Sequence, residues 1–193
     1  LTVGGWISSI AEIETLLEHG ADKIADNTHA FRNPAFITEA AKVFGSQCIV
    51  VSIDAKRDES GEAVVWIDRG REGTGVDPAQ WARRAEQHGA GEILLTSIDN
   101  DGMRKAYYLP RIKSVSAPVG IPVIAFGGVG HWSHMVAGVT EGGVDAVSAG
   151  NIFHFTEHST KKAKEYLREH GVDVRDTFFY RVSIPRRPRY KQY

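Results

Sequence analysis

The chain of 193 residues has a single cysteine, almost no net charge and no long apolar run. One cysteine excludes an internal disulfide, and its position in the apolar run Cys48–Val51 predicts a buried thiol in a reducing compartment. A formal net charge of −1 gives no overall basic field for nucleic acid or an anionic membrane. No apolar stretch approaches the ~20 residues of a membrane helix, and no signal-peptide pattern occurs. We therefore expect a cytoplasmic protein that binds neither nucleic acid nor membranes.

Short apolar runs alternate with amphipathic stretches along nearly the whole chain, which indicates parallel βα units. Helix starts are marked by a capping box, Ser9 with Glu12, and by Asn-Pro and Asp-Pro pairs at Asn33 and Asp77. The last helix is expected from about Ser159 to His170. Six strands are expected, at Leu1–Val3, Lys23–Ala25, Cys48–Ile53, Glu92–Ser97, Pro122–Ala125 and Asp145–Ala149.

An internal repeat favours a closed barrel over a doubly wound sheet. A Gly-Gly turn follows one strand at Gly4–Gly5 and another at Gly127–Gly128, and each is followed by a helix and a Gly-x-Asp strand start. Two copies of this unit suggest the two-fold pseudosymmetry that a barrel accommodates. The sequence therefore predicts an α/β fold, an incomplete TIM (β/α)8 barrel of about six βα units over residues 1–175. Asp58–Gly75 is expected to form an inserted hairpin, and the basic, aromatic residues 176–193 a disordered tail.

Glycine-rich turns after the strands are candidate phosphate sites, because backbone amides there can approach an anion closely. One Gly-Gly pair alone is equally a bare turn. Two pairs, each followed one unit later by Asn27–Thr28 or Gly150–Asn151, favour two phosphate cradles and a substrate with a phosphate at each end. The segment Ser97–Gly102 either holds a sugar hydroxyl or phosphate, or is turn chemistry.

Three charged residues are placed at strand ends. Asp54 follows an apolar strand, where lost solvation raises a carboxylate's pKa toward a range useful for proton transfer; a cap is the alternative. Lys23 and Glu92 each begin an apolar run, so both are expected at the amino-terminal face of the barrel. From the residues alone, the simpler interpretation is that both are solvated charges at strand ends. The histidines show no metal-ligand spacing, and we expect no metal site.

Several of these segments together resemble the cyclase subunit of imidazole glycerol phosphate synthase, from histidine biosynthesis. The similarity runs from Leu1 to about Arg175 and corresponds to the family's barrel from its third strand to its eighth. Because the chain begins with Leu1 rather than Met, inside an expected strand, we expect the first quarter of the barrel to be missing. The segments that carry the resemblance are Leu1–Gly5, Gly20–Lys23, Phe44–Gln47, Ser52–Arg57, Gly89–Ser97, Ile121–Ala125, Gly127–Gly130 and Ile152–Phe155.

The resemblance implies a lyase that uses ammonia to split and close a bis-phosphorylated ribulosyl-formimino aminoimidazole carboxamide ribotide, without a cofactor. The products are imidazole glycerol phosphate and aminoimidazole carboxamide ribotide. It also implies a glutaminase subunit docked on the amino-terminal face of the barrel. Asp54 matches one of the family's two catalytic aspartates. The family's contacts to one phosphate are matched by Gly5, Asn27 and Thr28, and those to the other by Asp101, Gly102, Gly128, Gly150 and Asn151. The ammonia gate and tunnel are matched by Thr2, Lys23 and Glu92.

The sequence departs from the family pattern beside both cradles. Trp6 replaces a glycine, Phe126 a small residue, Met103 a threonine and Asn151 a serine, while Asp26 occupies an outward-facing apolar position. These departures favour two alternatives to the histidine-pathway enzyme. One is a paralogue that delivers ammonia for amino- or amidino-sugar synthesis in a surface polysaccharide. The other is a non-catalytic, truncated scaffold.

Overall fold

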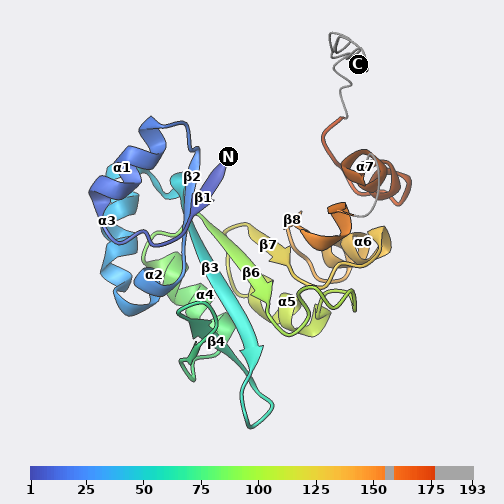
Figure 1. Ribbon diagram of the computed structural model, residues 1–193, viewed down its shortest axis with the longest axis horizontal. Helices are drawn as coiled ribbons and strands as arrows, with labels where there is room; N and C mark the ends of the chain where they lie inside the picture. The colour runs from blue at the N-terminus through green and yellow to red at the C-terminus, as the bar shows by residue number, and fades with distance from the viewer. Residues whose placement is uncertain (155–158, 177–193) are drawn as a thin grey trace, which may run out of the picture.

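The computed structural model describes residues 1–154 and 159–176, which form a parallel sheet curled into a half-barrel (Figure 1). Six parallel strands follow one another in the order β1-β2-β3-β6-β7-β8. This arrangement confirms the predicted incomplete TIM-type barrel. The strands are β1 (Thr2–Gly4), β2 (Lys23–Asp26), β3 (Ile49–Arg57), β6 (Glu92–Ser97), β7 (Val123–Phe126) and β8 (Ala146–Val147).

Helices connect the successive strands and lie along the outer side of the arc (Figure 1). Ser9 accepts from the Glu12 amide while the Glu12 side chain bonds back, which completes the predicted capping box of the first helix. The Asp77 carboxylate caps α4 in the same way, through the amides of Ala79 and Gln80. The helices are α1 (Ile10–Glu18), α2 (Thr28–Arg32), α3 (Pro34–Phe44), α4 (Pro78–Gln87), α5 (Leu109–Ser116), α6 (Trp132–Thr140) and α7 (Ser159–Glu169), with 3-10 turns η1 (Ser46–Cys48) and η2 (Asn151–His154).

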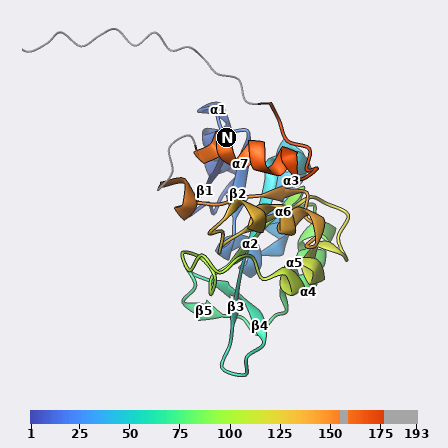
Figure 2. The same ribbon diagram turned by 90° about the vertical axis from the view of Figure 1, so that its right-hand side faces the viewer.

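The inserted hairpin is formed by β4 (Ala63–Ile67) and β5 (Glu72–Gly73), as predicted. β4 pairs antiparallel with the second half of β3, from Asp54 opposite Trp66 to Arg57 opposite Ala63. This pairing prolongs β3 beyond the predicted end. Both views place the hairpin and α7 at opposite ends of the molecule (Figures 1 and 2).

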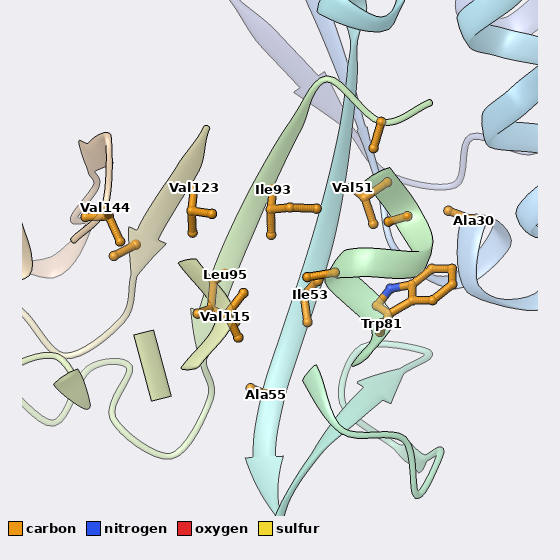
Figure 3. Packing of buried hydrophobic residues seen from close by; sticks show 14 of the residues in the cluster. Ala30, Val51, Ile53, Ala55, Trp81, Ile93, Leu95, Val115, Val123 and Val144 are labelled. Atoms are coloured by element: carbon orange, nitrogen blue, oxygen red, sulfur yellow. The ribbon is translucent and has the colours of Figure 1, made fainter. Parts of the chain in front are cut away.

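The main core lies between the outer face of the sheet and the helices. Alternate residues along the strands, among them Val51, Ile53 and Ile93, are fully buried against α4 and α5 (Figure 3). Trp81 of α4 is also buried, with 1% of its surface exposed. Because side chains alternate along a strand, the residues between these core positions, such as Asp54, point to the inner, concave face.

Two expectations about single residues need correction. Cys48 ends η1 and is half-buried, packed against the core, rather than lying inside a buried strand. Asp54 does not end its strand, because β3 continues to Arg57. Residues 176–193 were expected to form a tail, and nearly all of them lie outside the described residues. No helix among the described residues is long and apolar enough to cross a membrane.

Candidate active site at the carboxyl ends of the strands

A pocket of about 500 Å³ opens at the carboxyl ends of β1 and β2 and beside the middle of β3. It brings together four residues that the sequence selected: Gly5, Asn27, Thr28 and Asp54. These residues come together because neighbouring parallel strands bring their carboxyl ends to the same edge of a sheet. The other lining residues are Gly4, Trp6, Ile7, Ser8, Ala25, Asp26, His29, Arg32, Ser52, Asp68 and Arg69.

Asp54 lies on the inner face of β3, directly opposite Thr96 of β6 in the sheet register. Burial raises the pKa of the Asp54 carboxyl, while a hydrogen bond from the Thr96 hydroxyl opposes that shift. A carboxyl whose pKa is raised holds a proton more readily than a solvated one and is a stronger base when ionised. Thr96 was not predicted from the sequence. Every second residue of a strand faces the same side, so Glu92, Leu94 and Thr96 of β6 share the inner face.

Asp26 is a second carboxyl group at the pocket. It accepts a hydrogen bond from the Ala30 amide at 2.7 Å, and burial raises its pKa. The carboxylate therefore closes the first turn of α2 rather than remaining unpaired in the core, which removes much of the cost expected for an outward-facing acid. The short helix itself was not predicted.

The side chains of Asn27 and Thr28 contact the hairpin. The Asn27 amide donates to the Trp66 carbonyl at 3.4 Å, and the Thr28 hydroxyl accepts from the Asp68 amide at 2.9 Å. These bonds hold the turn after β4 over the pocket. Arg32 of α2 is also joined to the hairpin, through an ion pair with Glu72.

Two loops at the rim of the pocket have left-handed backbone at residues other than glycine. Trp6 follows Gly5 with φ 58°, and Asp68 and Arg69 have φ 49° and 60°. The Arg69 guanidinium lies 4.4 Å from the centre of the Trp6 ring, which links the two loops. The Trp6 side chain nevertheless remains 76% exposed.

The second predicted cradle is covered by neighbouring backbone. Gly128 is buried, and a Cβ added there would overlap the Ala106 carbonyl. The amide of Ala106 donates back to the Gly128 carbonyl at 2.9 Å. Asp101 and Gly102 are exposed on the loop that leads to Ala106.

The remaining members of that second set lie after β8. Gly150 is exposed, and a Cβ added there would lie 3.9 Å from the Phe126 ring. Asn151 begins η2. The Tyr107 hydroxyl donates to the Ser148 carbonyl at 2.7 Å and so ties the loop after β6 to the end of β8. Tyr107 is buried, and burial raises its pKa. Sequence reasoning did not select it.

Two histidine side chains accept hydrogen bonds from backbone amides at the start of α6. The Gly130 amide donates to His134 Nδ1 at 3.1 Å, and the Ser133 amide donates to His131 Nδ1 at 3.1 Å. Both Nδ1 atoms must be unprotonated to accept these bonds. Two amides near the second Gly-Gly turn are therefore already satisfied by imidazole.

Lys23 and Glu92 form an ion pair at the opposite end of the inner face. Their side chains are 32% and 19% exposed. The ion pair reaches across the intervening strand β3 near Val50, which lies opposite Glu92 in the sheet register. Thr2 pairs with Lys23 in the sheet and lies beside them on β1. Sequence reasoning expected both charges at the amino-terminal face, and there the structure brings them together.

Within residues 1–154 and 159–176, no group of three or more histidine, cysteine or acidic side chains could hold a metal ion. The pocket lining offers the carboxyl groups of Asp26 and Asp54, the guanidinium groups of Arg32 and Arg69, hydroxyl groups and an imidazole. A comparison with known protein families agrees with this half-barrel fold. The model of the histidine biosynthesis protein family matches residues 1–159, and the chain belongs to that family of TIM-barrel histidine biosynthesis enzymes.

Proposed function

We propose that the protein is an ammonia-using cyclase of histidine biosynthesis, a lyase of the imidazole glycerol phosphate synthase type. The observation that carries the proposal is the inner face of the half-barrel. It has the Lys23–Glu92 ion pair at its amino end and the half-buried Asp54 carboxyl in a pocket toward its carboxyl end. This arrangement suits a reaction in which a small nucleophile enters at one end and a larger substrate binds at the other.

The sheet register gives the path between the two ends. Val50 lies opposite Glu92, and Asp54 lies opposite Thr96, so four residues separate the ion pair from the acid. At about 3.3 Å per residue this is about 13 Å. Ala25 and Ser52, which line the pocket, are small residues on the inner side of their strands. An uncharged ammonia molecule could pass them, whereas an ammonium ion would lose its hydration there.

Asp54 is proposed as a general acid and base. Burial raises the pKa of its carboxyl, which makes the group a better proton acceptor than a solvated aspartate, and the hydrogen bond from Thr96 orients it. In the proposed reaction Asp54 transfers protons as ammonia attacks, the ribotide leaves and the imidazole ring closes with loss of one water. The first phosphate group would lie at Gly5 and the backbone of Asn27 and Thr28, and the second at the loops after β6, β7 and β8.

A glutaminase subunit is the proposed source of ammonia. It would dock at the amino-terminal face, where Lys23 and Glu92 form the gate and Thr2 lies beside it. The partial exposure of the pair is consistent with a contact that reaches the channel entrance.

The test is Asp54→Asn in the full-length protein, assayed with saturating ammonium salt and the bis-phosphate substrate. We expect kcat to fall by ~10²-fold or more, with little change in substrate affinity, because general acid–base catalysis is lost. Asn keeps the shape and can still accept from Thr96, so folding should be retained. Turnover near the wild-type rate would remove Asp54 from the mechanism. An inactive wild-type protein would favour the non-catalytic scaffold.

A second candidate function is ammonia delivery to a different acceptor, such as a sugar precursor of a surface polysaccharide. The covered Gly128 turn favours it, because the Ala106 carbonyl fills the space beside Gly128 and the Ala106 amide donates to the Gly128 carbonyl. Phe126 adds a bulky ring beside Gly150 at the same place. Activity with glutamine and a singly phosphorylated or nucleotide-linked sugar, without activity on the bis-phosphate, would select this alternative.

A further inference from the structure

The feature that the proposed reaction leaves unexplained is the contact between Trp6 and Arg69. Trp6 stands in the loop after β1, and Arg69 in the turn between β4 and β5. Both residues have left-handed backbone, which costs a residue other than glycine about 1–2 kcal/mol. A glycine at either place would avoid that cost. The two side chains instead stack across the rim of the pocket at 4.4 Å.

The stacking geometry leaves the binding edge of the arginine available. An aromatic ring contacts the flat face of a guanidinium, while the N–H donors lie in its plane and point outward. Arg69 has no ion-pair partner among residues 1–154 and 159–176. Arg32, the other arginine at the pocket, is paired with Glu72. Arg69 is therefore the cation best able to bind an incoming anion.

The neutral groups of the first cradle are partly engaged elsewhere. The Thr28 hydroxyl accepts from the Asp68 amide, and the Asn27 side chain donates to Trp66. The Thr28 bond also fixes the residue directly before Arg69, so the turn that carries the guanidinium is held over the pocket. A bound anion would thus find a positioned arginine in addition to backbone amides.

We propose that Arg69, held against Trp6, binds the phosphate monoester end of the substrate and that the two residues determine the specificity of this pocket. The inference rests on the proposed function only in its choice of a phosphorylated substrate. A planar fork of donors matches phosphate oxygens in a bidentate manner, and stacking reduces the freedom that the side chain must lose on binding. Trp6 is then a positioning residue, and the exposed face of its ring is the outer wall of the pocket.

The experiment measures binding of inorganic phosphate and of glycerol phosphate to the full-length protein by calorimetry at one fixed ionic strength. We expect Arg69→Ala to weaken both by about tenfold or more, and Arg69→Lys to restore part of the loss because charge is kept without the fork. Trp6→Gly should weaken binding several-fold, about the effect of one exposed cation–π contact, with no loss of folding because glycine accepts the left-handed backbone. The matched control is Arg71→Ala, on the same hairpin but outside the pocket lining, which should leave binding within about twofold of wild type.

Three results would overturn the proposal. Unchanged phosphate affinity in Arg69→Ala would place the anion elsewhere. Tighter binding in Trp6→Gly would mean that the ring obstructs the pocket rather than positioning the arginine. Acetate that binds as tightly as phosphate, and equally through Arg69, would make this a carboxylate site. The assay needs no turnover, so a failure of the proposed cyclase reaction is detected separately from a failure of phosphate binding.

Discussion

The Lys23–Glu92 ion pair makes a prediction that tests both the fold and the proposed ammonia route. Its two side chains come from β2 and β6 and meet across the intervening strand β3. We consider Lys23→Met, which keeps the length of the side chain but removes the charge, and Glu92→Gln, which keeps the shape of the acid. The double variant removes both charges together.

The exposure of the pair sets the expected magnitude. Fully exposed ion pairs contribute about 0.2–1 kcal/mol, whereas removing one partner of a buried pair costs about 3–5 kcal/mol. With exposures of 32% and 19%, this pair lies between those limits. We expect each single variant to lower the free energy of unfolding by about 1–2 kcal/mol, since one charge is left half-buried without its partner. The double variant should lose less than the sum of the singles.

The stability assay is chemical denaturation of the four proteins as a double-mutant cycle. A coupling energy of about 0.5–1.5 kcal/mol is expected for groups in direct contact. The functional assay compares two nitrogen sources in the assembled synthase, glutamine and ammonium salt. Lys23→Met should lower the glutamine-dependent rate at least about tenfold, equal to about 1.4 kcal/mol, while sparing the ammonium-dependent rate.

Two different outcomes would refute two different steps of this reasoning. Additive stability losses in the cycle would mean that the side chains do not interact in solution. Equal losses of activity with both nitrogen sources, despite a measured coupling, would place the damage in folding or in the pocket and would leave the pair without a role in ammonia transfer.

Two further predictions concern stability. Burial, and then the neighbouring His131, lower the pKa of His134, so below the ordinary value of 6.5 the unfolded chain binds more protons than the folded one. The free energy of unfolding should therefore be constant above pH 6.5 and fall as the pH drops through the lowered pKa. Urea denaturation from pH 5 to 8 measures this profile, which the double variant His131→Asn with His134→Asn should flatten. Gly91→Ala should lower the free energy of unfolding by about 1–3 kcal/mol, because its Cβ would overlap the Ser46 carbonyl. If the variant melted at the wild-type midpoint, Gly91 would not be packed closely against Ser46.

The elements with strong local signals could be predicted closely. Glu92–Ser97 and Ala63–Ile67 have the bounds that the sequence suggests, because apolar or β-branched runs there are bounded by glycine or polar turns. Ser9 and Glu12 form the capping box because both side-chain bonds are local. The repeated Gly-Gly units indicated a barrel rather than an open doubly wound sheet, and the curled six-strand order agrees with that choice.

What could not be predicted depends on contacts between distant segments. β3 extends to Arg57 because β4 pairs with it, and no local pattern marks that extension. Gly128 looked like an open turn, but its surroundings depend on where the loop ending at Ala106 crosses it. Arg69 carries no motif and reaches the pocket only because the hairpin folds back toward α2, through the bond to Thr28.

The strained backbone of the chain is concentrated at the two places where glycine pairs were expected to bind phosphate. Among the described residues, five residues other than glycine have positive φ. Trp6 belongs to the first place and Arg69, with its neighbour Asp68, faces it, whereas Arg104 and Ala106 lie against Gly130 and Gly128 at the second. Strain of this kind persists only where surrounding contacts over-determine it. At the first place those contacts leave a pocket with an available guanidinium, and at the second they fill the turn. The two glycine turns therefore differ in their surroundings, and we expect a ligand to be anchored more firmly at the first than at the second.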